Sequence, residues 1–299
     1  MTDAQIKQSR QVLADPSMTH STPGEEFAQA AALSSNERDI VVPFRAYLPE
    51  AFPLFAHRPR FTVRHLMKMA TVRDEDIPYI REPQPDTDDH IVSGTTFETT
   101  PESSLQPTLE CAQLTDISVA VPVPARLLNS PRLLAAFIDY RLLVRFGTRE
   151  NQILLHGDKR GAVPGLLTLS GMRSVRTGKD AVDVLASASA IVEETGGSCD
   201  GIVAHTAVYW QAVESGLLHK LTEAGIRIAR TRMIPRDCVL LGDFRAAVTF
   251  LDPGVSALIL HRRTEQDGTD TLEARSRMGL AVHLPQHFVL VEANKVAEV

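Results

Sequence analysis

Residues 130–158 read SPRLLAAFIDYRLLVRFGTRENQILLHGD and decide the fold of this chain. Ser130 is a favourable N-cap, and Pro131 suits the first position of a helix. Apolar side chains then recur every three or four residues, which places them on one helix face: Leu134, Phe137, Ile138, Leu142 and Phe146. Gly157 is a typical C-terminal stop. The stretch predicts one helix ending at His156, roughly 39 Å long at about 1.5 Å per residue.

The whole chain has the composition of an ordinary globular protein. Of its 299 residues, 43% are hydrophobic and 23% charged, and its formal net charge is −6. The length suggests one or two domains with sizeable cores, and the total charge does not indicate a polyanion binder. The N-terminus lacks a basic and apolar leader, and no run of eighteen apolar residues occurs, so we expect a cytoplasmic protein with no membrane partner. The three cysteines lie far apart and fit reduced thiols.

Residues 1–60 are interpreted as an N-terminal arm. A short helix is expected over 25–33, too short to be stable alone. Further apolar residues then follow in a proline-rich context, at 41–44 and 52–55. Such a segment cannot bury these side chains by folding on itself. We therefore expect the arm to lie against another surface, such as another copy of the chain.

Composition changes abruptly over 74–116, the segment interpreted as an extended loop. It holds eleven acidic residues and one basic residue, Arg81. Its five prolines exclude a long helix, and alternation over 90–93 and 95–99 suggests short strands. Because an isolated two-stranded ribbon is only marginally stable in water, we expect this segment also to need a partner surface.

The rest of the chain alternates between helix and strand patterns. One helix is expected over 180–195 and another from Thr206 to Gly216, with a short buried strand at 201–204 between them. Apolar, strand-like runs close the chain, at 238–241, 247–250, 257–260, 280–283 and 288–291. This order of elements predicts an α+β fold.

The same order resembles that of the major capsid proteins of tailed phages and the related encapsulins. Three local matches carry the resemblance: ENQILLHGD at 150–158 followed by GLL at 165–167, GIVAHT at 201–206, and VLLGDF at 239–244 followed by EARSR at 273–277 and VHLPQHF at 282–288. Together they cover roughly residues 70–292.

The resemblance implies a Hong Kong 97 type capsid fold. Its expected parts are an N-terminal arm (1–60), an extended β loop (74–116), a peripheral domain with a long spine helix (61–73 and 117–175) and C-terminal strands (246–299), and an axial α/β domain (176–245). Proteins of this superfamily assemble into icosahedral shells. The resemblance therefore implies a non-enzymatic structural protein whose partners are many copies of itself.

Two shell functions stay open. One is an encapsulin-like nanocompartment that encloses a cargo protein in the cytoplasm; the other is a phage or prophage capsid that encloses DNA in a virion. The arm is too short for a large fused scaffolding domain, and its six basic and seven acidic residues nearly balance. Such balance favours the compartment, because DNA binding needs excess positive charge. An oligomeric enzyme or binding module is the distant alternative.

Charge patterning suggests how copies meet. Residues 126–160 hold seven basic side chains and three acidic ones. We hypothesise that the acidic loop of one subunit lies over the basic helix of its neighbour, since complementary charge sets register and assembly rate. The candidate inter-subunit residues are Asp86, Asp88, Asp89, Glu98 and Glu102 on the loop and Arg141, Arg145 and Arg149 on the helix. The plain alternative is a solvated loop and an unrelated Arg face.

The resemblance also places residues 214–225 near a symmetry axis of the shell. His219, Lys220 and Glu223 are the candidate pore-lining residues there, and an ordinary loop between helix and strand is the alternative. Residues 69–158 contain no lysine. The covalent cross-link that some related capsids form from the extended loop is therefore not expected.

No pattern indicates catalysis. Cys199 and His205 flank a strand, and nothing in the sequence brings them together. His283 and His287 are separated by Pro285, which prevents the helical spacing of a metal pair. Phosphate-binding loops and a nucleophile elbow are missing from the sequence. The sequence predicts no catalytic residue, no cofactor and no metal.

Overall fold

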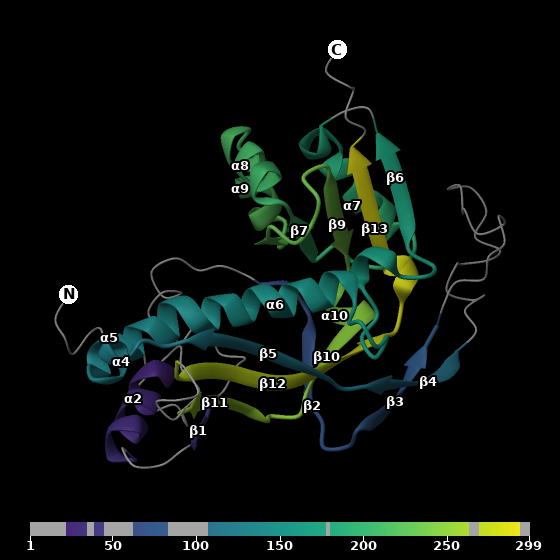
Figure 1. Cartoon of the computed structure of the whole chain (residues 1–299). Helices are drawn as coiled ribbons and strands as arrows, with labels where there is room; N and C mark the ends of the chain where they lie inside the picture. The colour runs from purple at the N-terminus through teal and green to yellow at the C-terminus, as the bar shows by residue number, and fades with distance from the viewer. Residues whose placement is uncertain are drawn as a thin grey trace, which may run out of the picture. The chain divides into compact units, whose positions relative to one another are not determined.

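The computed structural model describes residues 22–34, 39–44, 62–82, 107–177, 180–262 and 269–293. The chain forms two compact units, each assembled from three separate stretches (Figure 1). Unit 1 comprises Met1–Arg60, Asp116–Glu150 and Gly254–Arg277, and unit 2 comprises Phe61–Thr115, Asn151–Pro253 and Met278–Val299. Both units mix helices and strands, as the predicted α+β class requires.

The sheet of unit 1 is antiparallel where its register is defined. Its strands are β1 (Asp39–Pro43), β5 (Thr115–Pro122), β11 (Ser256–His261) and the first part of β12 (Thr271–Val282). β11 lies between β1 and β12, and β5 also pairs with β12. Leu258 and Leu260 of β11 and Leu272 and Ala274 of β12 are fully buried. Because side chains alternate along a strand, one face of this sheet forms part of the core of the unit.

The long helix predicted up to His156 is present, in three consecutive segments. These are α5 (Pro131–Phe137), a π-helical turn η5 (Ile138–Leu142) and α6 (Leu143–His156). Leu134, Ile138 and Leu142 are buried, as their spacing predicts. Gly157 ends the helix with a φ of 80°, a conformation that glycine adopts readily. Ser130 is the N-cap residue of α5, as predicted, although its side chain makes no capping hydrogen bond.

Two shorter helices complete the description of unit 1. They are α2 (Pro23–Leu33) in the arm and α4 (Ala125–Leu128) before the long helix. The sequence predicted the arm helix two residues too short. Thr22 and Glu25 form a capping box at its start, and Pro23 occupies the first turn, where its missing N–H costs nothing.

Unit 2 is built around a five-stranded mixed sheet with the order β6-β13-β9-β7-β8. The strands are β6 (Arg173–Thr177), β7 (Gly201–Ala204), β8 (Arg227–Arg230), β9 (Cys238–Gly242) and β13 (Phe288–Ala293). Apolar residues of the sheet form one buried cluster with those of α7 (Leu185–Glu193), α8 (Thr206–Glu214) and α9 (Leu217–Glu223). The predicted buried strand at 201–204 is therefore confirmed as β7.

Unit 2 contains further strands besides the five-stranded sheet. β10 (Val248–Asp252) pairs antiparallel with the last part of β12 and parallel with β2 (Lys68–Thr71), and β3 (Asp76–Arg81) pairs with β4 (Thr108–Gln113) as a separate ribbon. Short 3-10 turns lie at Val63–Leu66, Leu166–Thr168, Ala181–Val184 and Pro285–His287. The strand predicted over 247–250 starts one residue later, because Asp243 caps the short helix α10 (Phe244–Ala247).

Two neighbouring carboxylates fix the turn between β9 and α10. Asp200 accepts hydrogen bonds from the amides of Phe244 and Arg245, and Asp243 accepts from the amides of Ser198 and Ala246. Burial raises the pKa of Asp200 to about 6, and the negative charge of Asp243 adds to the rise. These bonds hold the end of the sequence VLLGDF in the turn between β9 and α10.

Candidate subunit interface

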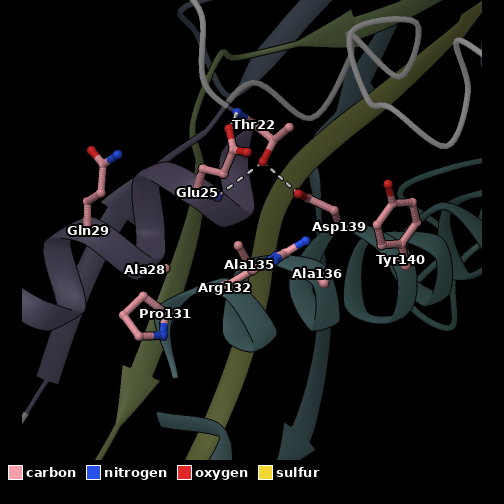
Figure 2. A pocket seen from close by; sticks show the side chains of 10 residues that line it. All are labelled: Thr22, Glu25, Ala28, Gln29, Pro131, Arg132, Ala135, Ala136, Asp139 and Tyr140. Atoms are coloured by element: carbon pink, nitrogen blue, oxygen red, sulfur yellow. Dashed lines mark hydrogen bonds between the residues drawn. The ribbon is translucent and has the colours of Figure 1, made fainter. Parts of the chain in front are cut away.

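The arm helix α2 packs on α5 of its own chain. Phe27 of α2 is fully buried and Asp139 is 4% exposed. Thr22 Oγ1 donates to Asp139 Oδ2 at 2.6 Å, and the Gly24 amide donates to Asp139 Oδ1 at 2.9 Å. Figure 2 shows Thr22 reaching from the start of α2 to this carboxylate. A carboxylate at a helix N-terminus is favourable, so this part of the arm finds its partner surface within its own chain.

An open cavity of about 480 Å³ lies between α2 and α5. Its polar lining comes from Glu25 and Gln29 of α2 and from Arg132, Asp139 and Tyr140 of the long helix (Figure 2). Burial raises the pKa of Asp139, and the hydrogen bonds from Thr22 and Gly24 oppose that rise only in part. The π-helical turn that carries Asp139 is of a kind that often marks functional positions.

The exposed side of the long helix is basic. Arg132, Arg141 and Arg145 are exposed and Arg149 is half-buried, while the two acidic residues of the helix, Asp139 and Glu150, are 4% and 2% exposed. Arg141 and Arg145 make no hydrogen bond or ion pair with another described residue. Arg141, Arg145 and Arg149 are spaced four apart, about 6 Å per step along a helix. The helix therefore presents a row of positive charge that no exposed acid on the same helix offsets.

One face of the β3–β4 ribbon packs on its own unit, and the other face is exposed to solvent. On the packed side, Ile77, Tyr79 and Ala112 lie against a small apolar cluster that includes Leu251 and Ala281. The base of the ribbon is thus docked on its own unit, more firmly than its acidic, proline-rich sequence suggests.

Polar contacts reinforce that packed side. Tyr79 donates its hydroxyl proton to Glu110 at 2.8 Å and lies edge-on to His283, and Arg81 pairs with Glu110 at 3.1 Å. Burial, followed by the bond to Glu110, raises the pKa of Tyr79 to about 12. The ribbon base is consequently a fixed element of unit 2.

The opposite face of the ribbon is apolar and solvent-exposed. Ile80 and Leu109 are directly opposed in the ladder and are 56% and 76% exposed. The next pair on that face is Pro78 and Cys111, which are also exposed. Four adjacent apolar or weakly polar side chains in water are unusual unless another surface covers them.

The candidate pore residues lie on a helix instead of a loop. Gly216, with a φ of 72°, turns the chain from α8 into α9, which carries His219, Lys220 and Glu223. His219 Nε2 lies 3.3 Å from Glu223 Oε1, and both side chains are well exposed. The described residues thus place all three on one short exposed helix.

An exposed aromatic group on α8 was not anticipated from the sequence. Trp210 is 59% exposed, and the Arg230 guanidinium lies 4.4 Å from the Tyr209 ring centre and 5.6 Å from that of Trp210. Tyr209 is partly buried against the core of unit 2, whereas Trp210 is largely in solvent. Glu214 lies four residues after Trp210 and therefore on the same helix face, and this acidic neighbour could have indicated that the face is exposed.

The residues weighed for catalysis have structural roles. Cys199 is buried, and its burial raises the pKa of the thiol. His205 caps α8 by accepting from the Ala207 amide at 3.1 Å, and the helix starts at Thr206, as predicted. His283 bonds Thr249 Oγ1 and the Ile80 carbonyl. Within the described ranges, no group of three or more His, Cys, Asp or Glu side chains could hold a metal ion.

The five acidic loop candidates lie outside the described residues, as do the strands predicted over 90–99. These candidates are Asp86, Asp88, Asp89, Glu98 and Glu102.

In the part of the chain that the structure describes, no helix is both long and apolar enough to cross a membrane.

Comparison with solved structures identifies the fold. A virus-like particle protein from Pyrococcus furiosus superposes with a TM-score of 0.55 at 12% identity, covering 80% of this chain and 95% of that one. The capsid protein of a native GTA particle gives 0.53 at 14% identity, with 78% and 89% covered. A protein of Mycobacterium phage Bobi gives 0.56 at 13% identity, with 77% and 89% covered. No protein-family model and no curated protein matches the sequence.

The chain thus has the fold of the tailed-phage major capsid proteins and encapsulins, the Hong Kong 97 type. The resemblance drawn from the three sequence motifs is confirmed at the level of the fold.

Replacing Gly24 by Ala should release α2 from α5. A Cβ at this position would lie 2.3 Å from the Ala135 carbonyl oxygen and 2.8 Å from Asp139 Oδ1, so the helix must move. We expect hydrogen-exchange protection of the α2 amides to fall at least ten-fold. Gly147→Ala is the matched control, because nothing lies within 4 Å of its Cβ, and it should stabilise the helix by about 0.5–1 kcal/mol. Unchanged α2 protection in Gly24→Ala would show that this packing is wrong.

Proposed function

We propose that this chain is a self-assembling icosahedral shell protein that forms an encapsulin-like compartment around a cargo protein. A virus-like particle protein, the capsid protein of a GTA particle and a protein of Mycobacterium phage Bobi share this fold. The location in this proposal is the cytoplasm of a prokaryotic cell. Its principal partner is a large number of identical copies.

The proposal rests on one observation: the outer face of the β3–β4 ribbon is apolar and exposed to solvent. Ile80 and Leu109 are exposed although the other side of the same ribbon is packed within unit 2. Burying such a pair is worth about 1.5–3 kcal/mol per side chain. In a closed shell every subunit meets equivalent neighbours, so each copy could bury the exposed pair of the copy beside it. The gain would then be repeated at every such contact of the shell.

The basic row on the long helix supports a second contact between copies. Arg141 and Arg145 have no partner among the described residues, and the helix carries no exposed acid. In the proposed shell the acidic loop of one subunit, with Asp86, Asp88, Asp89, Glu98 and Glu102, lies over this row on its neighbour. Such complementarity directs partners into register more than it adds affinity.

The division of the chain follows the shell architecture in this proposal. Residues 1–60 form the arm, 74–116 the extended loop, 61–73 with 117–175 and 246–299 the peripheral domain, and 176–245 the axial domain. Helix α9 then lies near a symmetry axis, with His219, Lys220 and Glu223 lining a pore. Their exposure on one short helix is compatible with that place.

A phage or prophage capsid that encloses DNA is the second candidate. The specific observation in its favour is that the protein of Mycobacterium phage Bobi superposes as well as the Pyrococcus furiosus particle, with TM-scores of 0.56 and 0.55. The net charge of −6 and the balanced arm favour the compartment, since packaged DNA attracts positively charged surfaces.

Electron microscopy of the purified chain, combined with absorbance at 260 and 280 nm, tests the function. We expect round, closed particles whose absorbance ratio is that of protein alone and which contain a second polypeptide when isolated from the native cell. Particles filled with nuclease-resistant DNA, or bearing tails, would instead establish the capsid. A small discrete species would contradict both.

Changing Ile80 and Leu109 together to Ser should block assembly without unfolding the chain. Exposed positions contribute little to the stability of one copy, usually within about 0.5 kcal/mol, whereas the loss is repeated at every contact of a shell. We expect unassembled but folded chains, by circular dichroism and sedimentation. Leu33→Ser with Val255→Ser removes two similarly exposed apolar side chains and is the control. Normal particles from the Ile80 and Leu109 variant would exclude the ribbon as an interface.

Replacing Arg141, Arg145 and Arg149 by Gln should slow assembly and weaken its dependence on salt. Electrostatic steering is lost when one charged surface is neutralised, and salt screens exposed charges over about 10 Å at 0.1 M. Light scattering at several ionic strengths measures the rate. A control with Arg160, Arg232 and Arg236 changed to Gln alters net charge equally at other exposed positions. The same rate and salt dependence as the parent chain would refute the charge-pairing hypothesis.

A further inference from the structure

Helix α8 of unit 2 turns apolar side chains to solvent. Trp210 is 59% exposed, and Val213, on the next turn of the helix, is 37% exposed. Because neighbours on a helix face are three or four residues apart, Ala207 and Glu214 lie on this face as well, and both are exposed. These four residues form the outer face of α8, opposite the side that packs on the core of the unit.

A positive charge lies beside Trp210. The Arg230 guanidinium, at the end of β8, is 4.4 Å from the Tyr209 ring centre and 5.6 Å from the Trp210 ring centre. Such distances allow cation–π attraction, which holds the guanidinium against the rings. Arg230 makes no hydrogen bond or ion pair with another described residue. Its N–H donors are therefore available to a carboxylate.

A negative charge lies at the C-terminal end of the same face. Glu214 is the last residue of α8, and within the described ranges it forms no ion pair. A carboxylate at this end of a helix is unfavourable because the helix dipole is negative there, and α8 has no basic residue in its last turn. The outer face of α8 thus runs from a positive charge, through Trp210 and Val213, to a negative charge that lacks a cation.

We propose that two copies of the chain pair through the outer face of α8, with the two helices antiparallel about a two-fold axis. A face with opposite charges at its two ends is complementary to an inverted copy of itself, which is what a two-fold contact requires. In this pair Arg230 of one copy binds Glu214 of the partner subunit, and Trp210 packs on Val213 of the partner subunit. Both contacts occur twice, once in each direction.

The side chains in this contact are of the kinds that dominate protein interfaces. Trp, Tyr and Arg are enriched among the residues whose loss weakens binding most. An Arg side chain already held by an aromatic ring also loses little freedom when it binds. One helix face buries less surface than a tight dimer needs, so we expect a weak pair with a dissociation constant of roughly 10–100 μM.

Fluorescence measures the contact directly, because Trp210 is the only tryptophan in the sequence. The pairing uses neither the β3–β4 ribbon nor the basic helix face, so it is tested in the Ile80→Ser, Leu109→Ser chain, in which shell assembly should be blocked. As the chain concentration rises from about 1 to about 300 μM, we expect quenching by uncharged acrylamide to fall roughly three-fold, in step with a change from monomer to dimer in sedimentation.

If the Ile80→Ser, Leu109→Ser chain still forms particles, the ribbon contact is wrong, and the pairing is measured in the wild-type chain below the concentration at which particles appear. The two proposals can therefore fail separately. Shielding of Trp210 only inside closed particles would mean that another surface of the shell covers it, and the two-fold pair would be wrong.

Charge reversal tests which residues meet. Glu214→Arg and Arg230→Glu each place like charges opposite one another twice, so each should weaken pairing about ten-fold. The two changes combined in one chain should restore it, because the reversed face is again complementary to its inverted copy. Glu193→Arg changes an exposed acid on α7 and is the matched control, which should pair like the parent chain.

Circular dichroism shows whether the Arg230→Glu chain keeps its fold, and Glu214→Arg tests the contact at a residue with no contact to lose in the single copy. Unchanged pairing in Glu214→Arg would overturn the proposal. So would a combined variant that pairs no better than the single ones, or a parent chain that stays monomeric with Trp210 equally quenched at every concentration.

Discussion

Among the described residues, the β3–β4 ribbon packs one face on its own unit, and its other face is apolar and exposed. Ile77 and Tyr79 are anchored in unit 2, which fixes the position of Ile80 and Leu109 on the opposite side. Ile80 and Leu109 point away from the packing in unit 2, because alternate residues of a strand point in opposite directions. The proposal of a shell depends on this constraint more than on any other feature of the molecule.

The apolar side chains in the described part of the arm, unlike those of the ribbon, are covered within the same chain. Buried Asp139 binds the first residues of α2, and β1 adds to the edge of β11, so the apolar side chains Phe27 and Phe44 are covered without a neighbour. Residues 22–34 and 39–44 of the arm thus have a partner surface in their own unit. In our proposal, the ribbon and the basic helix face are surfaces that meet other copies.

Sequence patterns predicted the regular elements well where one periodicity dominated. The apolar spacing of Leu134, Ile138 and Leu142 indicated the long helix, and four consecutive buried residues indicated β7. They did not predict η5, because a π-helical turn leaves no mark on a three- and four-residue pattern. Nor did they predict that α9 is helical. They also did not predict that α2 has a partner at Asp139, because that contact depends on a carboxylate 115 residues away from Gly24 in the chain. Long-range pairing decides such features, and local composition does not record it.

The most direct measurement is sedimentation of the purified wild-type chain over a wide range of concentration. We predict a single closed particle far heavier than the 32.8 kDa chain, with few species of intermediate size, because each added copy covers another ribbon. A folded monomer that persists at the highest concentration, with Ile80 and Leu109 still in contact with water, would contradict the proposed shell.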